Sequence, residues 1–145
     1  MTGIVDYGVG NLFSLYSSLK YIGEETLVVS NLEQMASCDR IILPGVGAFG
    51  DAARKLSESG LKKALLSEVK KGKPLLGICL GMQMLFEKSY EFGEYEGLGL
   101  IPGSVRSIRD VIDPGCKVPH IGWNTLSFPE ERAKSSLFSG LDAGA

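Results

Sequence analysis

The sequence predicts an α/β fold in which a doubly wound, mostly parallel sheet is flanked by helices. Short apolar segments alternate with stretches whose apolar residues recur at helical spacing, an alternation typical of parallel sheets covered by helices. Residues 75–78 show no polar alternation, which fits a strand buried on both faces. The chain has 145 residues. A chain of this length buries about two thirds of its surface on folding, and we expect a single domain.

The individual elements follow from apolar spacing and from the residues that begin or end helices. Strands are expected at residues 4–5, 26–29, 41–43 and 75–78. Helices are expected from 12 to 22 with Asn11 as the cap, from 51 to 60 with Asp51 as the cap, and from 61 to 72. After residue 87 the pattern changes, and two extended segments are expected at 100–108 and 117–123.

Charge and composition exclude several classes of protein. Fifteen Lys and Arg stand against 17 Asp and Glu, and no long basic run offers a nucleic-acid site. The longest apolar stretch, residues 74–82, is far shorter than the ~20 residues of a membrane span, and Asp6 interrupts any signal peptide. Three widely spaced cysteines and one histidine predict neither a disulfide framework nor a metal site. We expect a soluble, cytoplasmic protein that needs no cofactor.

The candidate nucleophile is Cys79, at the expected junction of a strand and a helix. Gly77 and Gly81 flank it at the spacing of a nucleophile elbow, where a reactive side chain sits in a strained turn. Residues without Cβ atoms let the chain fold back closely, and the N–H groups of the following helix favour the thiolate. The N–H of Leu80 is then placed to bind an oxyanion. The alternative is that Cys79 is a small core residue.

A second glycine cluster follows the third expected strand. Gly45, Gly47 and Gly50 satisfy the G-x-G-x-x-G pattern of dinucleotide sites. That pattern normally follows the first strand, and the acidic residue about 20 positions later should end a strand, whereas Glu68 falls in an expected helix. A tight turn is a second interpretation. We favour a third, in which the loop lies beside Cys79 and supplies a backbone N–H to a tetrahedral intermediate.

Together these residues resemble a known family. Residues 77–83 resemble the nucleophile motif of class I, triad-type glutamine amidotransferases. Three more motifs narrow the resemblance to HisH-type glutaminase subunits of imidazole glycerol phosphate synthase: residues 6–11, 43–49 and 119–124. Residues 97–103 also fit. The resemblance implies a flavodoxin-like fold, with residues 1–145 as a single type-1 glutamine amidotransferase domain that is incomplete at its C-terminus.

The resemblance also implies a mechanism. The thiolate of Cys79 would attack the side-chain amide of glutamine. The N–H of Leu80 and, after a rotation of its peptide, the N–H of Val46 would form the oxyanion hole. Gly47 and Gln83 match positions that hold the substrate. The ammonia would pass to a cyclase subunit, a TIM barrel, for use in histidine biosynthesis.

The remaining motifs concern the partner. The resemblance implies that the interface with the cyclase includes Tyr7, Asn11, His120, Trp123 and Asn124. Simpler interpretations are a polar loop residue for Tyr7 and a helix cap for Asn11. For His120 the simpler interpretation is a residue placed for packing or a hydrogen bond, and for Trp123 it is a core residue.

The family's general base and its orienting glutamate lie in a His-x-Glu segment near the C-terminus, and this sequence stops before that segment. We therefore expect the 145 residues alone to be inactive. Three alternatives stay open: the glutaminase of another class I amidotransferase, a nucleotide- or flavin-binding module, and a non-catalytic binding subunit.

Overall fold

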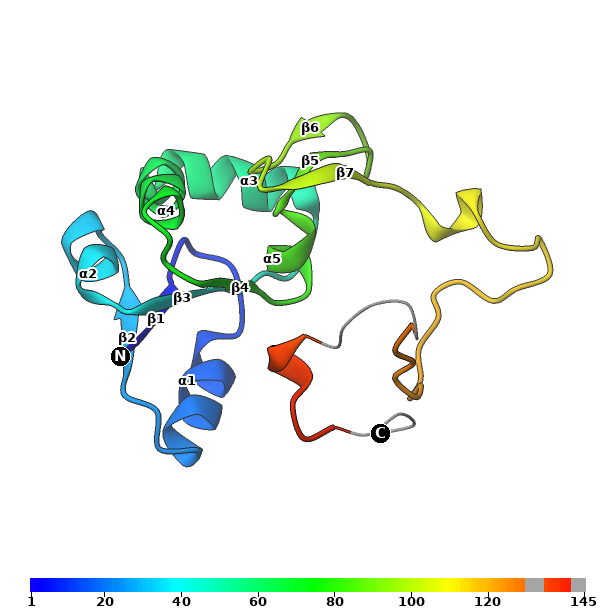
Figure 1. The fold of residues 1–145 in the computed structure, drawn as a ribbon. Helices are drawn as coiled ribbons and strands as arrows, with labels where there is room; N and C mark the ends of the chain where they lie inside the picture. The colour runs from blue at the N-terminus through cyan, green and yellow to red at the C-terminus, as the bar shows by residue number, and fades with distance from the viewer. Residues whose placement is uncertain (130–134, 142–145) are drawn as a thin grey trace.

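A four-stranded parallel sheet forms the centre of the protein. The computed structural model describes residues 1–129 and 135–141 (Figure 1). The strand order is β2-β1-β3-β4, with the bounds Thr26–Val29, Thr2–Val5, Arg40–Leu43 and Leu75–Gly77. All three neighbouring pairs are parallel. Because β1 lies between β2 and β3, the chain winds outward in both directions, and the predicted doubly wound fold is confirmed.

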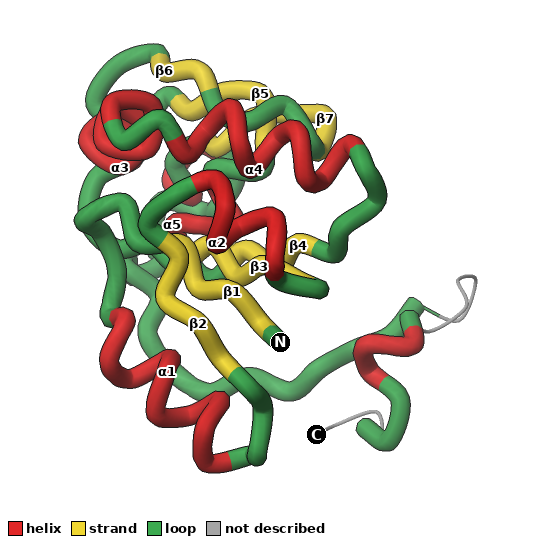
Figure 2. The backbone as a smooth tube through the Cα atoms, turned by 90° about the vertical axis from the view of Figure 1, so that its left-hand side faces the viewer, coloured by secondary structure: helices red, strands yellow, loops and turns green. Residues whose placement is uncertain are grey.

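Helices cover the two faces of this sheet unequally. They are α1 (Leu12–Tyr21), α2 (Leu32–Ser37), α3 (Phe49–Glu58) and α4 (Leu61–Lys70). Figures 1 and 2 show α1 on one face and the other three on the opposite face. The core lies under α2, α3 and α4, where Met35, Phe49 and Leu65 are fully buried against strand residues such as Val5 and Leu43. Helix α1 has no fully buried residue.

A small second sheet follows the short helix α5 (Leu80–Gln83). Its order is β6-β5-β7, with the bounds Tyr95–Glu96, Phe86–Ser89 and Ile101–Val105. Strand β5 pairs antiparallel with β6 and parallel with β7. Only β7 coincides with a predicted extended segment. The sheet lies against α3, close to the carboxyl edge of the central sheet (Figure 1).

The start of α3 differs from the prediction. The helix begins at Phe49, two residues before Asp51, so the assignment of Asp51 as the cap is wrong. The N–H of Phe49 instead donates to the Glu91 carboxylate at 2.7 Å. The carboxylate of a residue 42 positions away in the sequence therefore caps this helix. Asp51 instead pairs with Arg54 at 3.0 Å on the helix surface.

The chain after β7 leaves the two sheets in a long excursion (Figure 1). Its described residues contain two single-turn 3₁₀ helices, Ile108–Asp110 and Ser136–Phe138. Residues 117–123, predicted to be extended, pair with no strand in the described part of the chain, so that prediction is wrong. In the part of the chain that the structure describes, no helix is both long and apolar enough to cross a membrane.

Candidate active site

Cys79 occupies the turn between β4 and α5, as the sequence predicts. Its backbone has φ 54° and ψ −117°, a region that non-glycine residues rarely adopt. Such a conformation costs about 1–3 kcal/mol and persists only where the surrounding structure enforces it. The side chain is exposed, so the thiol is open to a substrate, and the interpretation of Cys79 as a buried core residue is wrong.

The flanking glycines explain how this turn is enforced. A Cβ at Gly77 would lie 2.6 Å from Cα of Met82, and one at Gly81 would overlap the carbonyl oxygen of Leu43. No side chain fits at either position without moving backbone. The elbow, which we define as residues 77–81, is therefore locked by main-chain packing.

A second loop lies directly beside the elbow. The glycine loop, defined as residues 44–47, leaves the carboxyl end of β3, and Leu43 is paired in register with Gly77 of β4. The N–H of Ile78 donates to the carbonyl of Leu43 at 3.0 Å. A Cβ at Gly45 would lie 2.6 Å from the backbone nitrogen of Gly81. The glycine loop and the elbow are thus in backbone contact.

Several backbone donors in these loops have no partner among the described residues, and two of them matter for the chemistry. They are the N–H groups of Leu80, the first residue of α5, and of Val46, in the middle of the glycine loop. The Val46 side chain is exposed, and Gly47 next to it has φ 85° with open space around its Cα. An unpaired N–H beside a thiol is the kind of group that can stabilise an oxyanion.

Gln83 lies one turn after Cys79 and faces a small cavity of about 350 Å³. The cavity is lined by Gln83, Tyr90, Glu91, Phe92, Val105, Arg106 and Ser107. Sequence analysis missed Glu91, which belongs to no motif. Its carboxylate is fixed by the N–H of Phe49 and is the acidic group of this cavity. It could pair with the ammonium group of an amino acid.

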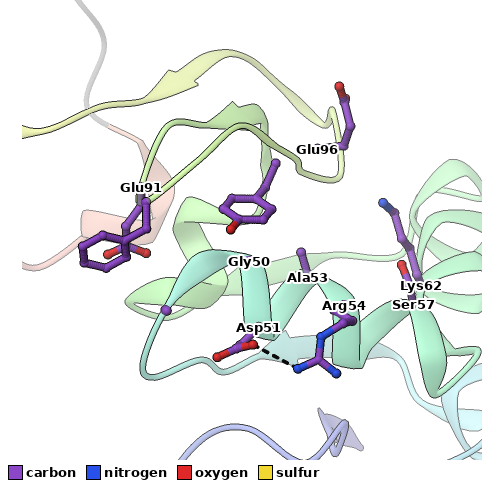
Figure 3. Close-up of a pocket in the computed structure, with 11 residues that line it drawn as sticks. Gly50, Asp51, Ala53, Arg54, Ser57, Lys62, Glu91 and Glu96 are labelled. Atoms are coloured by element: carbon purple, nitrogen blue, oxygen red, sulfur yellow. Dashed lines mark hydrogen bonds and ion pairs between the residues drawn. The ribbon is translucent and has the colours of Figure 1, made fainter.

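A larger cavity of about 620 Å³ lies between α3, α4 and β6, and it shares Glu91 and Phe92 with the smaller one. Figure 3 shows its lining, with the Asp51–Arg54 ion pair on one side and Lys62 and Glu96 across from it. Cys79 is not among the lining residues. We therefore place the chemistry at the elbow and not in this cavity.

The dinucleotide interpretation of the glycine cluster loses its support. The helix N-terminus that would bind a pyrophosphate already holds the Glu91 carboxylate. A Cβ at Gly50 would lie 2.6 Å from the Tyr95 ring, so this glycine serves close packing. Glu68 lies in α4, where Lys71 and Lys73 contact its carboxylate at 2.6 and 2.9 Å and hold its pKa below the ordinary value.

The structure does not bring His120 to the thiol. Among the described residues no side chain hydrogen-bonds Cys79, and His120 is exposed with its Nε2 2.9 Å from Nδ2 of Asn124. Trp123 is fully exposed and Ile121 is 87% exposed. The core interpretation of Trp123 is therefore wrong for this chain. His120 and Asn124 form a pair on the same exposed segment.

The two predicted interface residues near the N-terminus differ from each other. Asn11 caps α1, because its side chain accepts from the N–H of Ser14 at 3.1 Å. Tyr7 is only 4% exposed, and its hydroxyl donates to the carbonyl of Pro44 at 2.7 Å. Burial raises the pKa of Tyr7 to about 12, so the phenol stays protonated as a donor. Its ring faces the glycine loop and not the solvent.

Comparisons with known proteins identify the family of the chain. Residues 7–111 match the family of CobB/CobQ-like glutamine amidotransferase domains. The HisH subunit of imidazole glycerol phosphate synthase from Wolinella succinogenes is 48% identical over 99% of this chain and 69% of its own length. The Aquifex aeolicus HisH subunit is 49% identical over 99% of this chain and 66% of its own length. The chain thus spans about two thirds of the length of these relatives.

Solved structures support the fold. A crystal structure of a glutamine amidotransferase superposes with a TM-score of 0.61 at 23% identity, covering 71% of this chain and 54% of that one. A protein described as a putative peptidase E from Listeria monocytogenes gives 0.53 at 16% identity, covering 69% of this chain and 62% of that one. Likeness at such identities concerns the fold alone, whereas the sequence relatives decide the family. The chain belongs to the glutamine amidotransferases and, within them, to the HisH subunits of imidazole glycerol phosphate synthase.

Proposed function

We propose that this chain carries the nucleophile half of a glutaminase that supplies ammonia to the cyclase subunit of imidazole glycerol phosphate synthase. The single observation that carries the proposal is Cys79, held exposed at positive φ between two glycines that admit no side chain. Residues 1–145 would act as part of one glutamine amidotransferase domain, in the cytoplasm.

The reaction begins at the thiolate of Cys79. It attacks the side-chain amide carbon of glutamine, and the negative charge that develops on the amide oxygen is held by the N–H groups of Leu80 and Val46. Collapse of the tetrahedral intermediate breaks the C–N bond, and the leaving nitrogen takes up a proton and departs as ammonia. Water then attacks the thioester, releasing glutamate and the thiol. Gln83 and Gly47 hold the substrate, and Glu91 offers a carboxylate for its ammonium group.

Both proton transfers need a general base that the described residues do not place at Cys79. We propose that the base and its orienting carboxylate lie in the His-x-Glu segment of the family, and that turnover requires that segment. A chain extended to the length of its curated relatives should release glutamate with the cyclase present, whereas residues 1–145 should not. Sustained turnover by residues 1–145 would contradict the proposal and would make His120 the base.

The cyclase would contact the segment around Trp123. This tryptophan and Ile121 are among the most exposed large apolar side chains of the described residues. Aromatic residues of this kind are enriched at interfaces. His120, Asn124 and Asn11 would contribute polar contacts around them.

The nucleophile is tested by Cys79→Ser in the extended chain, with Cys116→Ser as the matched control, since both thiols are exposed. We expect Cys79→Ser to abolish glutamate release and Cys116→Ser to leave it unchanged. Complex formation without any hydrolysis by the extended wild-type chain would instead support a non-catalytic binding subunit.

A further inference from the structure

The hydroxyl of Tyr7 forms the one side-chain hydrogen bond to the glycine loop among the described residues. It donates to the carbonyl oxygen of Pro44 at 2.7 Å and lies 3.8 Å from Sδ of Met84, the residue that ends α5. Both contacts are buried. A buried phenol needs a partner, so the placement of the ring is specific.

This hydrogen bond fixes one peptide plane of the glycine loop. The carbonyl of Pro44 belongs to the peptide that also carries the N–H of Gly45. On one side of this peptide, Gly10 packs on the proline ring so closely that a Cβ would lie 3.0 Å from Cβ of Pro44. On the other side, Gly45 packs against the backbone of Gly81. The peptide between residues 44 and 45 is therefore held from three directions.

The next peptide carries the N–H of Val46. With the preceding peptide fixed, the direction of this N–H depends on the φ and ψ torsions of Gly45 alone. Gly47, at φ 85° and with nothing within 4 Å of a Cβ position, leaves the downstream end able to adjust. The loop thus has one rigid end, set by Tyr7, and one adaptable end.

We propose that Tyr7 is a positioning residue. Its hydroxyl holds the Pro44 carbonyl so that the N–H of Val46 is directed at the oxyanion that forms when Cys79 attacks the substrate amide. The inference rests on the proposed glutaminase function and adds a residue to its machinery. It gives Tyr7 a role inside the subunit, at the loop after β1 that also carries Asn11. The protonated state of the phenol follows from its burial, so the donor is present throughout the neutral and alkaline range.

The test is Tyr7→Phe, which removes only the hydroxyl, in a chain extended to the length of its relatives and assayed with the cyclase. Loss of a direct oxyanion donor costs about 10²–10³ in kcat, and loss of a group that acts through another should cost about tenfold. We expect that fall in kcat for glutamate release with KM for glutamine unchanged. Alkylation of Cys79 by iodoacetamide, a displacement that forms no oxyanion, should keep its wild-type rate.

Tyr21→Phe is the matched control. The Tyr21 ring is 91% exposed, so removal of its hydroxyl should leave kcat and KM unchanged. Turnover is expressed per alkylatable Cys79, at a temperature where each variant is folded, so that partial unfolding does not count as lost catalysis. A lowered melting temperature with unchanged kcat would overturn the inference and leave the hydroxyl a purely structural role. A raised KM with unchanged kcat would also overturn it.

Cys79→Ser, assayed in parallel, separates this inference from the proposed function. If Cys79→Ser still turns over, the glutaminase mechanism itself fails. If Cys79→Ser is inactive and Tyr7→Phe equals wild type, only the positioning role fails.

Discussion

The substitution Gly81→Ala tests whether main-chain packing enforces the conformation of Cys79. The added methyl group would overlap the carbonyl oxygen of Leu43 and would lie 2.8 Å from its carbonyl carbon. A carbon and a carbonyl oxygen approach no closer than about 3.3 Å even in a favourable contact. The elbow and the end of β3 must therefore separate.

The expected loss of stability comes from the interactions that this separation breaks. Overpacking in a close-packed interior costs about 1–3 kcal/mol. The same carbonyl of Leu43 accepts from the N–H of Ile78 at 3.0 Å, and loss of that hydrogen bond adds about 1 kcal/mol. We expect Gly81→Ala to lower the free energy of unfolding by about 3 kcal/mol. For a chain of this size that corresponds to a melting temperature about 10 °C lower.

The assay is thermal and urea unfolding followed by circular dichroism. Gly115→Ala is the matched control, because no atom lies within 4 Å of its Cβ position and its φ is not positive. Equal melting temperatures for Gly81→Ala and Gly115→Ala would refute the close approach of the elbow to β3. The packing argument for the strained cysteine would then fail as well.

Three further predictions concern reactivity, partner binding and pH. Cys79 should be alkylated faster than Cys38, which is 3% exposed and whose pKa burial raises; equal labelling in peptide maps would contradict this. Trp123→Ala should weaken cyclase binding by about 30-fold, or ~2 kcal/mol, by calorimetry without changing the melting curve, because the side chain is fully exposed. Glu68→Gln should cost stability at pH 7. Because the folded-state pKa of Glu68 is lowered, that difference is present above its unfolded pKa and should shrink as the pH falls below about 4 in urea titrations.

Features encoded over a few neighbouring residues could be predicted from the sequence. The cap at Asn11 needs only a side chain and an N–H three residues on, and the structure shows that bond. The elbow is a local pattern too, since the glycines at 77 and 81 sit two residues from Cys79 on either side. The parallel strands could be predicted because each is a short apolar run.

Features made by distant residues could not be predicted. The second sheet pairs strands of two to five residues, and β5 and β6 are rich in charged residues, so no apolar period marks them. The cap on α3 comes from Glu91, 42 residues from the N–H it accepts. The contact between Tyr7 and Pro44 spans 37 residues, and sequence analysis assigned Tyr7 either to the partner interface or to a polar loop.

The topology explains why the site is nevertheless assembled from motifs that lie far apart. Strands β1, β3 and β4 are adjacent and parallel, so the loops that follow them all emerge at one edge of the sheet. Tyr7, Pro44 and Cys79 each stand within two residues of the end of one of these strands. The strands themselves determine the fold, and the residues just beyond them determine the chemistry. A conservative change inside β3, such as Ile42→Val, should therefore lower stability with little effect on turnover per folded chain, whereas Tyr7→Phe should lower turnover per folded chain.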